Sequence, residues 1–196
     1  QEVFFPTLLV LFFFLFQFLQ FVKMSSIPAT PKLIPVFSMK LQLGGAPQQL
    51  FTDDSKKAVS NMAIVATGTT TTIENKYGFS LDLKDVKGYD NITAHLEKGY
   101  SELDAHVHGK TSDGTDVRID YFGLFQSLPG LNAVHSGQAD SHSFEESYVS
   151  NSPRFSFTGP VPEKLQWLER ENLIGKGHFF VEDAKTYVEY FTYIVR

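Results

Sequence analysis

The stretch from Ser101 to Phe125, SELDAHVHGKTSDGTDVRIDYFGLF, decides the fold, because both of its halves alternate around one turn. The turn is Ser112-Asp113-Gly114, and a three-residue loop that ends in Gly is typical of a type I turn closed by a left-handed residue. The sequence therefore predicts a β-hairpin in which Thr111 pairs with Thr115. A slip by one residue would set polar against apolar residues throughout, so the pattern itself selects this register.

The two faces of the predicted hairpin differ in character. One face carries two apolar pairs, Val107 opposite Ile119 and Ala105 opposite Tyr121. The other face is polar and carries Glu102, Asp104, His106, His108, Arg118 and Asp120, with Phe122 opposite Asp104. We expect the apolar face to belong to the core, and the polar face is the candidate site.

Composition limits the function classes. The chain has 196 residues, which is enough for one domain with a sizeable core and does not require two. Its net charge of -5 and pI near 5.7 argue against a nucleic-acid partner, which would need clustered Lys and Arg. The chain contains no Cys, so disulfides, thiol catalysis and cysteine-based zinc sites are excluded.

An apolar segment opens the chain, VFFPTLLVLFFFLFQFLQFV at residues 3–22. Its length matches the ~20 residues that span a bilayer. However, Gln precedes it instead of a basic start, no small-residue cleavage pattern follows, and Met24 resembles a natural start. We favour a read-through or added segment, with a signal or membrane anchor as the alternative. The expected organisation is a leader at 1–23, a linker at 24–32 and a barrel domain at 33–196, in a cytoplasmic protein unless the leader is genuine, which would make it secretory or membrane-anchored.

Short strand patterns fill the rest of the chain. Besides the hairpin, they cover Leu33 to Leu43, Asn61 to Ile73, Tyr77 to Leu83, Asn91 to His95, Phe144 to Phe157, Asn172 to Phe180 and Thr186 to Val195. Lys84 to Asp90 is rich in turn residues, Gln126 to Ser141 is read as a long loop, and Pro162 to Glu171 is the one helical turn. This predicts an all-β, antiparallel, calycin-like barrel of about nine or ten strands, closed or nearly closed.

A family resemblance appears in the C-terminal half. It rests on YVSNSPRF at 148–155, Thr158-Gly159, Trp167-Leu168 and IGKG at 174–177, and on Leu103-Asp104-Ala105 with Asp113-Gly114 in the hairpin. These motifs resemble the domain of unknown function family 3237, small antiparallel β-barrel proteins of bacteria and fungi. The resemblance runs from Leu33 to Val195, although Gln48 to Tyr100 departs from it. It implies a barrel fold and no defined activity.

Within this frame Asp104 is the leading candidate for a catalytic base, because it matches the family motif and faces the aromatic Phe122. Arg154 matches the Pro-Arg-Phe position of the family and is suited to holding an anion. The other candidate ligand-binding residues are Arg118, Trp167, Tyr121 and Phe122. A solvated strand face is the alternative for the hairpin, and for Trp167 we favour a plug of the barrel over a ligand platform.

His106 and His108 have a spacing similar to that of cupin metal ligands, but the other cupin residues do not follow. We therefore expect a salt bridge between His106 and Asp120, no metal and no cofactor, with His106 as a second catalytic candidate. His178 is a weaker site candidate, and His135 and His142 are expected to be exposed loop residues. No nucleophile elbow, phosphate loop or dinucleotide fingerprint is present.

These observations lead to two hypotheses. The first is a barrel that binds a small organic metabolite in its cavity and acts on a carbonyl or hydroxyl group by acid/base chemistry. The second is a structural or protein-interaction barrel without a ligand, in which the same charges are simply solvated. The volume of the interior separates them, because a packed barrel favours the second. Homo-oligomer formation stays open.

Overall fold

The computed structural model of the chain describes residues 30–196. From Leu33 onward they form one antiparallel sheet of nine strands. The strands are β1 (Leu33–Leu43), β2 (Gln48–Asp53), β3 (Ala58–Thr72), β4 (Lys84–His95), β5 (Tyr100–Lys110), β6 (Asp116–Gln126), β7 (Val149–Phe157), β8 (Leu173–Glu182) and β9 (Lys185–Val195). The predicted all-β class is confirmed.

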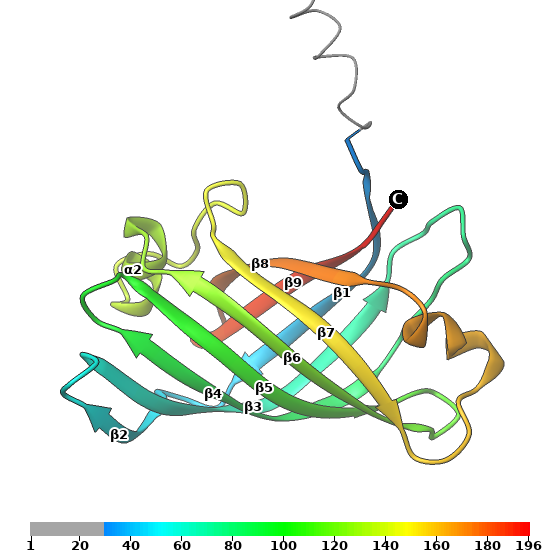
Figure 1. Ribbon diagram of the computed structural model, residues 1–196, viewed down its shortest axis with the longest axis horizontal. Helices are drawn as coiled ribbons and strands as arrows, with labels where there is room; N and C mark the ends of the chain where they lie inside the picture. Colours follow the sequence, from blue (N-terminus) through cyan, green and yellow to red (C-terminus); the bar gives the residue numbers. More distant parts are fainter. Residues whose placement is uncertain (1–29) are drawn as a thin grey trace, which may run out of the picture. The chain divides into compact units, whose positions relative to one another are not determined.

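The sheet closes on itself into a barrel of eight strands (Figure 1). The strand order is β1-β9-β8-β7-β6-β5-β4-β3-β2, and an additional pairing of β1 with β3 completes the ring. β3 makes this closure possible because it is long. Its first part pairs with β2 on one side, and its second part, Val65 to Thr72, pairs with β1 on that same side. β2 is thus an extra strand on the closed barrel.

The hairpin of β5 and β6 has the predicted register. Thr111 donates its backbone N–H to the carbonyl of Thr115 at 3.0 Å, and Gly114 has the expected left-handed φ of 86°. The pairs that follow are Val107 with Ile119 and Ala105 with Tyr121. All four of these side chains are buried, with at most 2% of their surface exposed. The apolar face of the hairpin is therefore the inner face of the barrel.

Two short helices lie at opposite ends of the barrel (Figure 1). Helix α2 (Pro129–His135) follows the end of β6, and the 3₁₀ helix η1 (Glu163–Glu169) follows the end of the antiparallel neighbour β7. η1 places Trp167 in the barrel end, where its ring stacks on Phe79 at 4.6 Å and approaches Phe37 at 6.5 Å. Trp167 thus packs among aromatic side chains at this end, as the plug interpretation predicted.

Four segments differ from the sequence predictions. The loop Gln126 to Ser141 contains α2, which is too short to show a period, although Leu131 and Val134 are buried. Lys84 to Asp90 is strand rather than turn, because pairing with β3 and β5 overrides its unfavourable composition. Tyr77 to Leu83 forms only an isolated bridge, and β2 was not predicted.

Pro153 marks an edge, as expected from its missing N–H. β7 pairs with β8 only from Val149 to Asn151, and Pro153 lies just beyond that point.

The apolar leader at 1–23 and residues 24–29 of the linker lie outside the described residues, so the interpretations of the leader stay expectations. Among residues 30–196, no helix has the length and apolar character needed to cross a membrane.

Candidate functional site

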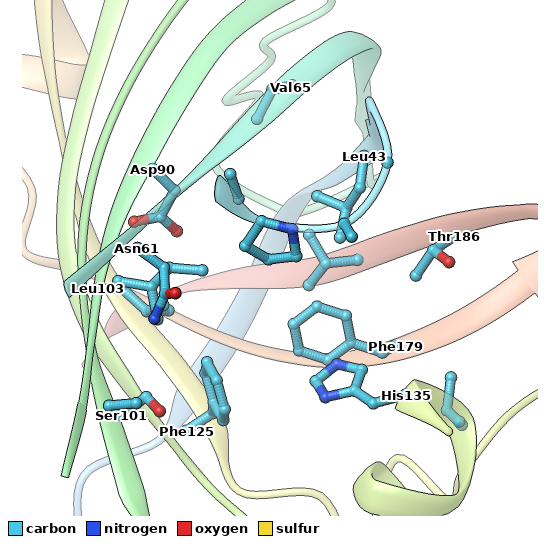
Figure 2. A pocket seen from close by; sticks show the side chains of 18 of the residues that line it. Leu43, Asn61, Val65, Asp90, Ser101, Leu103, Phe125, His135, Phe179 and Thr186 are labelled. Atoms are coloured by element: carbon cyan, nitrogen blue, oxygen red, sulfur yellow. The ribbon is translucent and has the colours of Figure 1, made fainter. Parts of the chain in front are cut away.

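A cavity of about 650 Å³ occupies the barrel interior at the α2 end (Figure 2). Most of its wall is apolar and comes from inward-facing residues that include Leu43, Val65, Ile92, Leu103, Phe125 and Val188. Cavities that hold small organic ligands commonly have ~300–1,000 Å³ and few polar groups. The barrel interior is thus hollow at the α2 end.

Asp90 is the charged group of this cavity. It lies on β4, with Ala63 of β3 and Ala105 of β5 as its ladder neighbours, and only 8% of its surface is exposed. Its Oδ1 accepts the backbone N–H of Asp104 at 3.0 Å. Burial raises the pKa of Asp90 to about 7, although that hydrogen bond acts in the opposite direction. Asp90 therefore exchanges a proton near neutral pH.

Two buried tyrosines, Tyr121 on β6 and Tyr190 on β9, share the cavity with Asp90. Their ring centroids are 5.7 Å apart. Burial raises the pKa of both phenols, and the nearby charge of Asp90 raises them further. Asp90, Ala105 and Tyr121 occupy one ladder row, and the small Ala105 leaves the space between the carboxyl and the phenol free. Both tyrosines therefore stay protonated, and because Tyr121 and Tyr190 hydrogen-bond to each other, one O–H group of the pair is left free to donate.

His135 of α2 lines the cavity across from Asp90, beside Phe179 (Figure 2). Its ring is 5.0 Å from that of Phe179 and 6.2 Å from that of Phe125. Burial lowers the pKa of His135, so its imidazole is neutral at neutral pH. His135 is exposed over part of its surface, as predicted, but it belongs to α2 rather than to an irregular loop, and the rest of its ring lines the cavity.

Among the described residues, no Lys or Arg lines the cavity, and Asp90 is its one carboxyl group. The site has no cation to attract an anionic ligand. A neutral ligand suits this wall.

The predicted site residues lie mainly on the other side of the sheet. Asp104, His106, Arg118 and Phe122 point away from the cavity, and 66% of the surface of Phe122 is exposed. The expectation that this face lines a cavity is wrong, because the barrel closes around the apolar face of the hairpin. Arg154 is also exposed on β7, opposite Asp120 in the ladder. Of the predicted residues, Tyr121 lines the cavity and Trp167 packs at the opposite end.

The outer polar residues form an ion-pair network. His106 Nδ1 lies 2.6 Å from Asp120 Oδ1, and Arg118 Nε lies 2.8 Å from the same carboxylate. His106 Nε2 approaches Asp104 Oδ1 at 3.3 Å. The predicted pairing of His106 with Asp120 is confirmed. Burial alone would raise the pKa of Asp120, but the contacts with His106 and Arg118 outweigh it and lower that pKa.

Two further histidines lie outside the cavity. His178 lies between the rings of Phe180 and Phe144, at 5.4 and 5.8 Å, on the outer side of β8. His108 is exposed opposite Arg118. Within residues 30–196, no group of three or more His, Asp or Glu side chains is arranged to hold a metal ion.

Sequence reasoning missed Asp90, Tyr190 and His135. Asp90 fell in the segment read as turn, although Val86, Asp90 and Ile92 keep the period of two that marks one face of a strand. Tyr190 belongs to a strand that is apolar on both faces, so alternation could not single it out. His135 needed the position of α2, for which the sequence has no periodic signal.

The chain was compared with known proteins. The model of the family "Protein of unknown function (DUF3237)" matches residues 31–195. Among proteins with curated descriptions, none matches the chain.

Solved structures show the same fold. A conserved protein of unknown function from Rhodopseudomonas palustris has a TM-score of 0.63 at 18% identity, covering 87% of this chain and 100% of that one. A β-barrel-like protein from Acinetobacter baumannii has a TM-score of 0.55 at 18% identity, covering 87% and 99%. An enzyme from Penicillium herquei has a TM-score of 0.51 at 18% identity, covering 86% and 98%. Because the family model spans nearly all of the described residues, the chain belongs to the DUF3237 family.

Proposed function

We propose that this barrel binds a small, neutral, largely apolar organic molecule in the α2-end cavity, and that Asp90 moves a proton to or from a hydroxyl or carbonyl group of that molecule. One observation carries the proposal. A carboxyl group with a pKa of about 7 lies in the wall of a cavity of about 650 Å³. A packed interior would have favoured a structural barrel instead.

The pKa of Asp90 suits both directions of proton transfer. General acid/base catalysts are most effective when their pKa lies near the working pH. Near pH 7 the carboxyl group of Asp90 is present in both forms, because burial disfavours its charge. The deprotonated form takes a proton from the ligand, and the protonated form returns one.

Tyr121 and Tyr190 supply the complementary role. Both phenols are buried and keep their protons. Because they hydrogen-bond to each other, one O–H group of the pair is free to donate to a ligand oxygen that gains negative charge. Donors that are already oriented in a water-poor site stabilise such an oxygen more than they would in water. A carbonyl compound that forms an enolate, or a phenol that forms a phenolate, fits this arrangement.

The rest of the wall limits the ligand. Phe125, Phe179 and the neutral His135 form an aromatic group at the α2 end. Such rings pack well against flat, apolar molecules. Without Lys or Arg among the described lining residues, a ligand carboxylate or phosphate would have no partner. The enzyme from Penicillium herquei, which shares the fold, supports catalysis on this scaffold.

Proton exchange tests this proposal without knowledge of the natural ligand. A panel of neutral aromatic ketones is incubated with the protein in D₂O, and loss of the α-proton signal is followed by NMR. We expect exchange that Asp90→Asn reduces by about 100-fold or more, since general base catalysis contributes ~10²–10⁴. Asp54→Asn, an exposed carboxyl far from the cavity wall, is the matched control. Equal exchange with wild type and Asp90→Asn would contradict the role of Asp90.

Binding is tested separately with the neutral fluorescent probe N-phenyl-1-naphthylamine. We expect saturable binding that Val134→Trp, on α2 in the cavity wall, abolishes by filling the space. Without binding, the structural or protein-interaction barrel would be the better interpretation.

A further inference from the structure

A second polar position lies on the inner face of the barrel, among side chains that the cavity wall does not include. One inner row of the sheet crosses four strands: Gly123 on β6, Asn151 on β7, Gly175 on β8 and Thr192 on β9. Asn151 is thus flanked on both sides by residues without a side chain. The row thus has two buried polar side chains, those of Asn151 and Thr192.

Neither polar side chain has a partner within residues 30–196. Both Oδ1 and Nδ2 of Asn151 lack a hydrogen bond, and so does Oγ1 of Thr192. Asn151 is 3% exposed and Thr192 is 0% exposed. A buried polar group without a partner destabilises a fold by about 1–3 kcal/mol, and nearly all such groups in native proteins bind something.

The side chain of Asn151 points along the row toward Thr192. A Cβ atom on Gly175 would lie only 2.0 Å from Asn151 Oδ1. The amide therefore lies across Gly175, and Thr192 is the next residue of the row on the far side. Only glycine at position 175 permits this placement.

The row lies between the two cavity tyrosines. Tyr121 is two residues from Gly123 on β6, and Tyr190 is two residues from Thr192 on β9, so all four face inward. The tyrosine rings meet across the intervening β7 and β8, with centroids 5.7 Å apart. The ring of Tyr190 also leans over β8, since a Cβ on Gly177 would lie 2.7 Å from its Cδ1. The amide and the hydroxyl thus lie beneath the tyrosine pair.

We propose that Asn151 and Thr192 together bind one hydroxyl oxygen beneath the tyrosine pair, supplied by an internal water or by the ligand. The amide of Asn151 can donate and accept hydrogen bonds, and so can the hydroxyl of Thr192. The hydroxyl of a ligand or of a water can also donate and accept, and an internal water typically makes 2–4 hydrogen bonds. If the ligand supplies this oxygen, the inference rests on the proposed function. If an internal water supplies it, the inference is independent of that function.

The first experiment compares Thr192→Val with the matched control Thr71→Val, which removes a hydroxyl from the exposed side of β3. Valine keeps the shape of threonine. If Thr192 binds a hydroxyl oxygen, the Tm of Thr192→Val should be about 2–4 °C lower than that of wild type, and the Tm of Thr71→Val should be unchanged. An equal or higher Tm for Thr192→Val would overturn the proposal, because removing a hydroxyl without a partner does not destabilise.

The second experiment identifies the source. Cross-relaxation between water and the Asn151 side-chain NH₂ signal in the ligand-free protein, absent when Asn151→Asp removes that signal, assigns an internal water. Binding of 2-naphthol and 2-methylnaphthalene then tests the ligand. If the ligand supplies the oxygen, wild type should prefer 2-naphthol by about tenfold, and Thr192→Val should lose that preference.

If neither the water signal nor the preference for 2-naphthol is found, the proposal fails. The Asp90→Asn variant keeps these experiments distinct from the proposed function. It should leave the water signal at Asn151 intact even where proton exchange is lost, so either idea can fail without the other.

Discussion

Asp90 and Asp104 belong to neighbouring strands and are joined by one hydrogen bond, yet they face opposite sides of the same sheet. Asp90 faces the barrel interior, where burial raises its pKa to about 7. Asp104 faces outward and belongs to the network of His106, Asp120 and Arg118. In that network contacts with His106 and Arg118 lower the pKa of Asp120. The side chains are chemically the same, and the difference between the two regions is their access to water and to cations.

This difference teaches that a cluster of charged residues on a strand is weak evidence for a site. The outer network has more ionisable groups than the cavity, but each is paired or hydrated, so its reactivity is ordinary. The cavity has one carboxyl group with no cation among its described lining residues. A single buried acid in an apolar wall is better suited to proton transfer than several paired acids on a surface.

The largest effect should come from placing a charge on the wrong face. Val107 and His108 are adjacent on β5, but Val107 is fully buried and His108 is exposed. Val107→Asp should destabilise the fold by more than about 4 kcal/mol or prevent folding, because the new charge has no partner. His108→Asp should change stability by less than about 0.5 kcal/mol. Urea denaturation measures both, and similar effects would contradict the assignment of the faces.

Asp90→Asn should remove a dependence of stability on pH. The pKa of Asp90 is about 7 in the folded protein, above the ~3.9 of an unfolded chain. Between these two pH values the folded state binds more protons than the unfolded state. The free energy of unfolding that the protonated Asp90 contributes is therefore lost as the pH rises through 7. At pH 8 the variant should be more stable than wild type, on the order of 2–4 kcal/mol, with little gain at pH 4. A difference that stays constant across this range would mean that Asp90 does not titrate there.

The outer ion-pair network should contribute much less to stability than the burial of Val107 or the protonation of Asp90. His106 and Asp120 form a contact of 2.6 Å that remains partly exposed to water. A double-mutant cycle with His106→Ala and Asp120→Ala should give a coupling energy of about 0.5–1 kcal/mol, reduced in 1 M salt. Both variants should keep the exchange of ketone protons, with the pH profile of His106→Ala moved slightly upward because His106 lowers the pKa of Asp90. A coupling energy above about 3 kcal/mol would place this pair in a far drier environment than its exposure indicates.

Asp104→Asn should have the smallest effect. Its side chain is exposed, and the backbone N–H that donates to Asp90 stays in place. Stability should change by less than about 0.5 kcal/mol. Because the charge of Asp104 helps to raise the pKa of Asp90, its removal should move the pH profile of proton exchange slightly downward. Loss of exchange in this variant would return the catalytic role to Asp104.

Local sequence patterns determined much of the fold. The hairpin register followed from the turn at Ser112-Asp113-Gly114 and from alternation on both sides of it, because these are interactions between residues close in sequence. β1 has the predicted bounds Leu33–Leu43 and alternates in burial from Phe37 to Leu41, whereas Val36, which the pattern placed on the polar face, is buried beside a register shift. The pairing of His106 with Asp120 followed from the same register. Trp167 was correctly expected at a barrel end, since a lone large ring after a helical turn needs an apolar partner surface.

What the sequence by itself determined is which side chains share a face of the sheet, because a period of two is a local property of the chain. The tertiary structure alone decided which face encloses a cavity, because that depends on β1 pairing with β3 and β9, residues far apart in sequence. It also brought Asp90 and Tyr190 from distant strands into one wall and placed His135 across from them. The pKa of Asp90 followed from that enclosure, since a carboxyl group titrates near neutral pH only when the surrounding chain has removed water from it.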